Sequence, residues 1–433
     1  MTLENAPAAR IALAEAAAAA AVPPAPPVAP SRPVRFTGEA GAFWRLLLRG
    51  ALLLAVTLGI YRFWLATDVR RFLWSHTEIA GESLEYNGTA AELLIGFLIA
   101  IAILVPINLI FFVLTLSMGE AGGLISMLGF PLLFVLGQFA VYRARRYRLT
   151  RTVLRGVRFH QTGSAIRYAF CATFWWVLVV LTLGLVYPFM QASLERYKMR
   201  NTFYGDLGGR FDGSGWRLFA RGVFLWLLVM VPLLVGIFGV LGSLDFEAIG
   251  EAMGGNQRAM TRFMMASSTQ AAIAFGTFGV GSSILLAILL FPVFQAIVLR
   301  WWLDGIRSGA LTVRSHLLKR RIYGAYLRFL GLALLLIVAT IVIGFVGLAI
   351  FGASPDGTGT EIAGTLASVA LYVVVMLGFS TIYQATMRLA LWRHGAESLE
   401  IEGLAVLEQV TATGRAGSAV GEGLADALNV GGI

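Results

Sequence analysis

The sequence contains little of what a soluble or disulfide-bonded protein needs. Only 13% of its 433 residues are charged, whereas about 25% is usual in soluble domains. Cys171 is the single cysteine, so the chain cannot form an internal disulfide or a multi-cysteine metal site. Hydrophobic residues make up 58% of the chain and the mean hydropathy is +0.77. These values predict a membrane protein with several spanning segments.

Lysine is nearly absent, since Lys198 and Lys319 are the two lysines and arginine supplies most of the net charge of +10. A nucleic-acid-binding protein of this charge would need a basic soluble domain, and no stretch free of apolar runs is long enough to form one. We therefore interpret the arginines as cytoplasmic topology charge and expect no nucleic-acid partner.

Residues typical of catalysis or metal binding are also scarce. The four histidines are far apart and lack zinc-ligand spacing, and no nucleophile–base set is recognisable. No charge lies in the middle of a hydrophobic segment, where it would mark a proton or ion pathway. The sequence thus indicates no catalytic residue, no metal and no cofactor, and leans against an enzyme.

What is abundant is long hydrophobic runs. If all eight crossed the membrane, the arginine-rich connections 143–167 and 191–217 would lie on opposite sides, against the positive-inside rule. If the first and fourth runs return to the side they entered, every basic cluster is cytoplasmic. We therefore predict an all-α polytopic membrane protein with three transmembrane helical hairpins, two re-entrant or interfacial helices and short cytoplasmic β-hairpins. The alternative is that the first and fourth runs also span the membrane. The runs are 46–61, 93–117, 121–142, 168–190, 218–243, 271–299, 326–351 and 364–387.

An internal repeat is suggested by residues 57–97, which align without gaps with 182–222 at an offset of 125. Matched residues include the pairs Gly59/Gly184 and Gly88/Gly213, which we interpret as turn glycines, and the pair Arg71/Arg196. In each copy an arginine-bearing helix leaves the membrane and is followed by an alternating, glycine-broken stretch typical of a β-hairpin.

A looser form of the motif places a glutamine four or five residues before an arginine at the ends of four apolar segments. Aromatic residues and an alternating stretch around a glycine follow each time, so five hairpins on one membrane face could pair into a cytoplasmic cap. We predict that these arginines and glutamines bind anionic lipid headgroups or form a scaffold. The pairs are Gln138 and Arg143, Gln191 and Arg196, Gln295 and Arg300, and Gln384 and Arg388.

Several segments together resemble the YjgN-like family of bacterial inner-membrane proteins, over about residues 34–410. They are RFTGEAGAFWRLLL, VTLGIYRFW and HTEIAGESLEYNGTAAELLIG near the start, and YQATMRLALWRHGAESLEIEG near the end. The resemblance implies a location in the bacterial cytoplasmic membrane and carries no activity with it. The chain departs from the family's pattern at Phe63-Trp64-Leu65, where tryptophan is often followed by a small residue and lysine.

We expect a disordered Ala/Pro-rich tail at 1–34, a membrane domain at 35–410 and a flexible tail at 411–433, with both termini cytoplasmic. The function expected is that of a lipid-interacting or transport-related membrane component. The alternative is a structural or assembly factor that binds membrane-protein partners, or its own copy, through the cytoplasmic face. A lipid enzyme is the least supported class. Within the membrane domain the repeats are expected at 35–157, 158–320 and 321–410.

Overall fold

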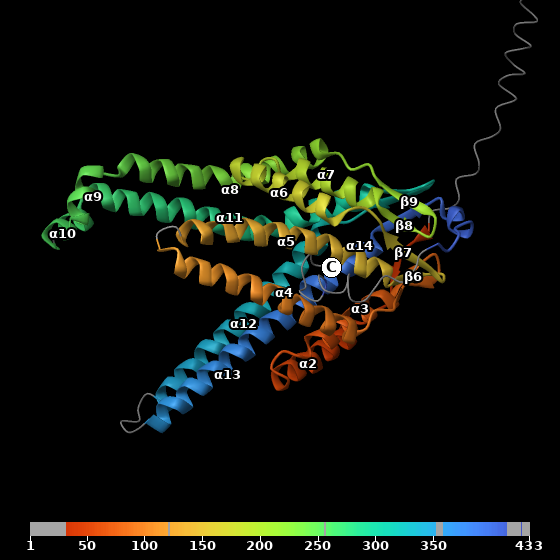
Figure 1. The fold of residues 1–433 in the computed structure, drawn as a ribbon, viewed down its shortest axis with the longest axis horizontal. Helices are drawn as coiled ribbons and strands as arrows, with labels where there is room; N and C mark the ends of the chain where they lie inside the picture. The colour runs from red at the N-terminus through yellow and green to blue at the C-terminus, as the bar shows by residue number, and fades with distance from the viewer. Residues whose placement is uncertain (1–31, 120–121, 255–256, 352–357, 414–425, 427–433) are drawn as a thin grey trace, which may run out of the picture.

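The structure is a computed structural model that describes residues 32–119, 122–254, 257–351, 358–413 and Asp426. Long helices project from a compact end at which the strands gather (Figure 1). Most of the two predicted tails, at 1–31, 414–425 and 427–433, lies outside the described residues.

Five helical stretches are long and apolar enough to cross a membrane. Nearly all residues in their apolar windows lie on the protein surface, a distribution that suits contact with lipid rather than water. The helix α5 (Gly122–Thr150) covers the third predicted segment and continues into the arginine-rich connection. The five are α4 (Ala90–Ser117), α8 (Gly215–Ser243), α11 (Ser267–Asp304), Lys319–Gly347 of α12 (Lys319–Phe351), and Ile362–Glu397, which combines most of α13 (Thr358–Tyr383) with the π-helix η3 (Gln384–Arg388) and α14 (Leu389–Glu397).

The first and fourth apolar segments form two helix pairs of matching length. The helices α2 (Ala40–Val56) and α6 (Ala165–Leu181) have 17 residues each, and α3 (Arg62–Ser75) and α7 (Tyr187–Arg200), which follow them, have 14 each. A helix of 17 residues is about 26 Å long, short of the roughly 30 Å of a bilayer core. In each pair a short turn joins the two helices.

Both turns use the same backbone conformation. Gly59 and Gly184 have φ of 91° and 90°, and the preceding residues Leu58 and Leu183 have φ of 49° and 51°. These left-handed angles are accessible to glycine at little cost. The leucines, by contrast, are held in a conformation that β-carbon-bearing residues rarely adopt.

The strands form one antiparallel sheet of nine, in the order β1-β12-β11-β10-β9-β8-β7-β6-β5, and a second sheet of three, β2-β3-β4. The fold is therefore mostly helical with two β-sheets, rather than all-α with separate short hairpins. Isolated hairpins leave edge groups unpaired, and here each hairpin satisfies the edge of the next. The hairpins are β6 (Thr152–Leu154) with β7 (Val157–Gln161), β8 (Thr202–Tyr204) with β9 (Leu207–Phe211), and β10 (Ile306–Ser308) with β11 (Leu311–Ser315).

The first and last predicted hairpins differ from the other three. The strands β3 (Thr77–Ile79) and β4 (Glu82–Ser83) pair with each other and with β2 (Arg35–Phe36) in the small sheet, while β5 (Glu85–Tyr86) joins the large one. Near the C-terminus, α14 runs on to Glu397 and leaves only one strand, β12 (Leu399–Glu402). The remaining short elements are α9 (Phe246–Met253), α10 (Gln257–Met265) and the 3₁₀ turn η4 (Leu404–Glu408).

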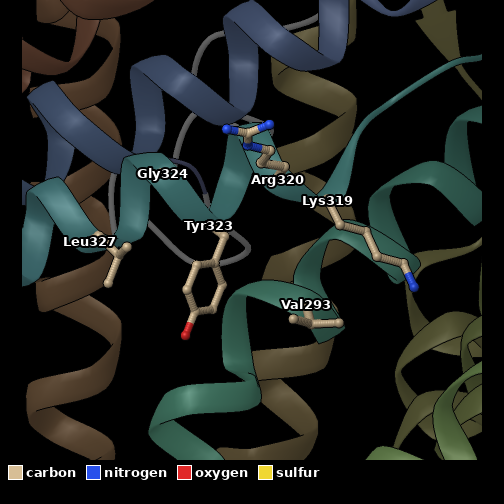
Figure 2. Close-up of a pocket in the computed structure, with 6 residues that line it drawn as sticks. All are labelled: Val293, Lys319, Arg320, Tyr323, Gly324 and Leu327. Atoms are coloured by element: carbon tan, nitrogen blue, oxygen red, sulfur yellow. The ribbon is translucent and has the colours of Figure 1, made fainter.

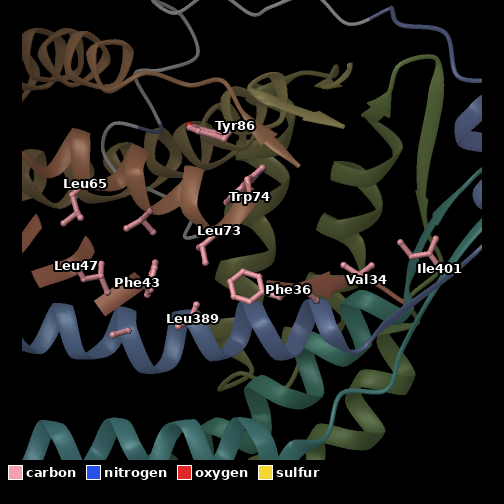
Figure 3. Close-up of a cluster of buried hydrophobic side chains, with 13 residues drawn as sticks. Val34, Phe36, Phe43, Leu47, Leu65, Leu73, Trp74, Tyr86, Leu389 and Ile401 are labelled. Carbon is pink, nitrogen blue, oxygen red and sulfur yellow. The ribbon is translucent and has the colours of Figure 1, made fainter. Parts of the chain in front are cut away.

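The beginning and end of the described chain pack together. The strand β1 (Arg32–Pro33) pairs with β12, and buried Phe43 and Leu47 of α2 lie in one cluster with Leu389 of α14 (Figure 3). The Trp392 indole donates to Thr77 Oγ1 at 2.9 Å. The first helix pair thus has its core completed by the last helix.

Close approach of two glycines joins α8 to α11. A β-carbon on Gly279 would lie 2.4 Å from the Gly236 Cα, too close for any side chain. Small residues at such crossings let helix backbones pack closely in membranes. Gly236 and Gly279 thus allow the two helices to pack closely.

Replacing Gly279 by alanine tests this contact. We expect Gly279→Ala to destabilise the protein by about 1–3 kcal/mol, because the new methyl group forces the helices apart. The matched control is Gly281→Ala on the same helix, whose added β-carbon would meet nothing within 4 Å. Thermal unfolding in detergent would measure both, and equal stabilities for the two variants would contradict the packing account.

Candidate functional site

The arginines singled out from the sequence lie in α3, α5, α7, α11 and η3. Two of them make the same bond 125 residues apart. Arg71 Nη2 donates to the Gly88 carbonyl at 3.0 Å, and Arg196 Nη2 donates to the Gly213 carbonyl at 3.3 Å. Each arginine thereby fastens its helix to the loop that follows a strand.

Gly88 and Gly213 share a second feature. A β-carbon at either position would fall within 2.6 Å of the aromatic ring two residues earlier, Tyr86 or Phe211. Neither glycine adopts the left-handed backbone of Gly59 and Gly184. They are therefore required by close ring packing, and the turn role predicted for them does not describe their geometry.

The four glutamine–arginine spacings do not build one common contact. Arg388 Nη1 donates to Gln384 Oε1 at 3.2 Å, whereas Arg300 pairs with Asp304 at 3.8 Å. Arg143 lies 5.8 Å from the centre of the Phe139 ring. Gln295 Oε1 is buried and has no hydrogen-bond partner among the described residues. We place no shared site on these pairs.

A basic hollow of about 550 Å³ lies between α2 and α3. Arg45 and Arg49 of α2 and Asp68 and Arg71 of α3 line it, so its fixed charges leave an excess of two positive charges. The remaining walls carry apolar and aromatic groups, together with a serine and a histidine. The lining residues are Arg45, Leu46, Arg49, Tyr61, Leu65, Asp68, Arg71, Phe72, Ser75 and His76.

The counterpart helix pair lacks this charge. At the offset of 125, Arg45 and Arg49 of α2 correspond to Phe170 and Phe174 of α6, both exposed. The two helix pairs therefore share their backbone plan, while only the first carries arginines on its outer helix at these positions.

A second basic hollow, of about 450 Å³, lies where α12 begins beside α11. Lys319 and Arg320 extend to either side of it, and the Tyr323 ring points between the two helices (Figure 2). Val293 and Leu327 form an apolar wall of this hollow. Cationic groups next to apolar surface between membrane helices are typical of sites for acidic lipid headgroups.

Three arginines near the end of α5 each interact with an acid from another part of the chain. They are three residues apart, a spacing that places helical residues along one face. Arg148 forms an ion pair with Asp426, and Arg151 forms one with Glu92 of α4. Arg145 is near enough to Glu195 of α7 to interact with it electrostatically.

The Glu92 contact is the most complete of the three. Its carboxylate accepts from Arg151 Nη2 at 2.9 Å, from Arg151 Nε at 3.1 Å and from the Tyr147 hydroxyl at 2.7 Å. The Arg151 side chain is only 7% exposed. The contact ties the first turn of α4 to the end of α5 through a bidentate, charge-assisted pair.

Glu195 is buried in α7, where it accepts from Lys198 Nζ and from the Trp302 indole, the latter at 3.0 Å. Burial alone would raise the pKa of this carboxyl, but the Lys198 ammonium and the Arg145 guanidinium outweigh it and lower the pKa below its ordinary value. The carboxylate therefore stabilises the fold above its ordinary pKa, and that contribution is lost as the pH falls through the lower folded value.

Arg148 belongs to the same buried layer as Asp426 and Arg70. Burial lowers the pKa of Arg148, and the neighbouring arginines add to that effect. Arg70, Arg148 and Asp426 were not singled out from the sequence. The α5 arginines recur every three residues, a pattern that is visible in the sequence. A single acid near the C-terminus forms no pattern that would mark it.

The described residues hold no three His, Cys, Asp or Glu side chains close enough together to bind a metal ion. The charged groups of this region instead pair arginines with single carboxylates. Such an arrangement can hold anions and fix helices, and it offers no recognisable set of reacting groups.

Residues 31–427 match the sequence profile of a family described as a bacterial protein of unknown function (DUF898). The chain belongs to this family. It is 29% identical over 153 residues to the inner membrane protein YjgN of Salmonella typhimurium, and 25% identical over 148 residues to that of Escherichia coli K12. The match spans 35% of this chain and of the Salmonella protein, and 34% of each in the other case. No solved structure matches the chain.

These relatives and the apolar helices agree on the setting. The chain is an integral inner-membrane protein of the DUF898 family, with five helices that are long and apolar enough to span. The resemblance to YjgN-like proteins predicted from the sequence is thereby confirmed.

We expect Glu92→Gln to destabilise the fold, because it leaves the Arg151 guanidinium buried beside a neutral amide. Removing one partner of a buried ion pair lowers the free energy of unfolding by about 3–5 kcal/mol. The loss for Glu92→Gln should be near the lower bound, because 23% of the Glu92 side chain is exposed. The control is Glu402→Gln, whose partner Arg314 is 65% exposed and which should cost no more than about 1 kcal/mol. Thermal unfolding would compare them, and a larger loss in the control would refute the assignment.

Proposed function

We propose that the protein binds anionic phospholipid headgroups at the cytoplasmic face of the inner membrane, through the basic hollow between α2 and α3. The observation that carries this proposal is the combination of Arg45, Arg49 and Arg71 with apolar wall in one hollow. Arginine guanidinium groups bind phosphate oxygens in a bidentate fashion, and the apolar wall suits the first carbons of acyl chains.

The surface of α2 supports contact with lipid. Leu48, Leu52 and Val56 are exposed and lie four residues apart, so they form one apolar stripe along the helix. Leu58 at the turn is 93% exposed. An exposed apolar stripe and turn next to two arginines is the pattern of a helix that enters the interfacial layer of a membrane.

The same features support the re-entrant topology expected from the sequence. In our proposal α2–α3 and α6–α7 enter the membrane and return, while α4–α5, α8–α11 and α12–α13 cross it as three hairpins. The two copies then derive from an internal repeat, which the matched lengths and the Arg71 and Arg196 bonds support. The nine-stranded sheet then faces the cytoplasm, where arginines concentrate.

The hollow beside Lys319 and Arg320 is a second candidate lipid site of the same chemistry. Its cations lie at the first residues of α12, at the compact end of the molecule where the strands gather. Two headgroup sites on one face suit a protein that organises anionic lipid around itself. Binding of membrane-protein partners, self-association and a role in transport stay predictions.

The lipid proposal is tested by the double variant Arg45→Phe/Arg49→Phe, which installs the residues of the counterpart helix α6. Each arginine near an anionic surface contributes about 1 kcal/mol to the free energy of binding. The Kd for phosphatidylglycerol should therefore rise on the order of tenfold or more. Titration of the purified protein in neutral detergent with phosphatidylglycerol, and separately with phosphatidylcholine, would measure it by native mass spectrometry.

The control for that experiment is Arg314→Gln/Arg210→Gln, which removes two exposed arginines of the sheet. Loss of phosphatidylglycerol binding in the control, or unchanged binding in the Arg45/Arg49 variant, would count against the hollow. Phosphatidylcholine binding should be the same in all three proteins.

The topology is tested with single cysteines in a Cys171→Ser background. We expect Glu251→Cys on α9 to react with a membrane-impermeant maleimide added to spheroplasts, and Arg210→Cys on β9 to react only after the membrane is permeabilised. Both native side chains are exposed, so access through the protein does not limit the reaction. Labelling of Arg210→Cys from outside would overturn the proposed orientation.

A further inference from the structure

The connection between α8 and α11 carries several large apolar side chains on its surface. It contains the short helices α9 and α10, which lie at the end of α8 and α11 that is remote from the strands (Figure 1). Phe246 and Met253 of α9 are 69% and 81% exposed, and Met260 and Met264 of α10 are exposed as well. Large apolar groups gathered on one exposed segment indicate an interaction surface.

The helix α10 separates apolar from basic residues. Met260 and Met264 are four residues apart, so they share one side of the helix. Arg258 and Arg262 have the same spacing but are displaced by two residues, which places them on the opposite side. A short helix with methionines on one side and arginines on the other is the pattern of a helix that lies in the interfacial layer of a membrane.

The helix α9 is divided in a similar way. Phe246 and Met253 are seven residues apart, close to two helical turns, so they share one side. Glu247 and Glu251 are turned away from that side by about 100° or more around the helix. Ala252 is buried, and α9 packs against α10. The apolar side of α9 is therefore distinct from both its acidic side and its packed side.

The length of α8 places the two short helices at a membrane boundary. The helix α8 is one of the five long enough to cross, and its residues 222–243 include no charged side chain. At about 1.5 Å per residue this stretch is about 33 Å long, close to the roughly 30 Å of a bilayer core. Arg221 precedes it and is exposed, so its guanidinium can reach the headgroups at the strand end. Phe246, the first residue of α9, then lies near the headgroups of the opposite leaflet.

The start of α9 is fixed by a local cap. The helix α8 ends at Ser243, and Leu244 has an extended backbone with φ of −72° and ψ of 127°. Asp245 Oδ1 then accepts from the backbone N–H groups of Glu247 and Ala248, both at 3.1 Å. Such a cap satisfies N–H groups that have no partner within the helix. The helix α9 is therefore a separate element with its own direction and does not continue α8.

The return into α11 is fixed as well. Ala266 is extended, with φ of −63° and ψ of 140°, and α11 begins at the next residue. Gln270 Nε2 reaches back to donate to the Met264 carbonyl at 2.9 Å. The end of α10 is thereby tied to the first turn of α11, so the position of α10 depends on that of the long helix.

We propose that α9 and α10 form an interfacial anchor in the membrane leaflet opposite the strands. Phe246, Met253, Met260 and Met264 insert among the first carbons of the acyl chains, while the charged sides face headgroups and water. The occupant is lipid because the anchor continues the lipid-facing surface of α8 and α11 at the depth where the headgroups lie. Flexible methionine side chains suit contact with mobile chains. The anchor is independent of the basic hollows at the strand end.

The test uses the full chain with Cys171→Ser, at one protein per phosphatidylcholine nanodisc. An NBD fluorophore is attached to Met253→Cys or, as the matched control, to Glu251→Cys on the acidic side of the same helix. Both native side chains are exposed, so the label does not disturb a packed core. A lipid with a nitroxide near the headgroup end of its acyl chain should quench the label at 253 at least twofold more than the label at 251. Aqueous iodide should quench them in the reverse order.

A second pair applies the same test to α10. Met264→Cys should be quenched more by the nitroxide lipid than Arg262→Cys, and less by iodide. The anchor requires this difference in both pairs, so equal nitroxide quenching within either pair would overturn the proposal. A label at 253 or 264 that is protected from both quenchers would indicate cover by protein, and would equally overturn the assignment to lipid.

Discussion

The arrangement of this protein depends on arginines that are withdrawn from water at one end of the helices. A guanidinium group cannot give up its proton at any ordinary pH, so its charge must be met by an anion once it is buried. Arg145, Arg148 and Arg151 meet acids supplied by α7, by the C-terminal part of the chain and by α4. Charge pairing therefore adds to the apolar packing that joins these helices.

The two helix pairs use this constraint in opposite ways. Arg70 of α3 and Glu195 of α7 occupy corresponding positions at the offset of 125, and both are buried beside the end of α5. One position supplies a positive charge that needs Asp426, and the other supplies a negative charge that Lys198 and Arg145 neutralise. At this position two similar backbone units thus carry opposite charges.

The sequence predicted those parts of the fold that follow from local pattern. Apolar runs of 20 residues or more have few stable conformations in a bilayer, so the long helices were foreseeable. The glycine-broken alternation likewise predicted β-hairpins, and the structure has three of them, at 152–161, 202–211 and 306–315. Pairing of the hairpins into a cap was predicted, but the order of the strands was not foreseeable, because it depends on edges that meet across 40 to 100 residues.

The candidate sites were predicted only in part. Arg71 was found because its counterpart at the offset of 125 is also an arginine, while Arg70 was passed over because its counterpart is a glutamate. Arg45 and Arg49 have phenylalanines as counterparts and lie before the aligned stretch 57–97, so the comparison of the copies did not mark them. Asp426 has no periodic neighbours that could mark it. Comparison of internal copies finds what the copies share, whereas the charges that distinguish these sites are where the copies differ.

The meeting of β1 with β12, and of α2 with α14, has a consequence for how the chain is made. Phe43 and Leu47 emerge from the ribosome early, but the Leu389 surface that covers them is translated last. Until then the first helix pair has an incomplete core, and its apolar side chains need temporary cover from lipid or from the insertion machinery. Contacts between distant parts of a chain form slowly, so this closing step should be the one at which biogenesis most often fails.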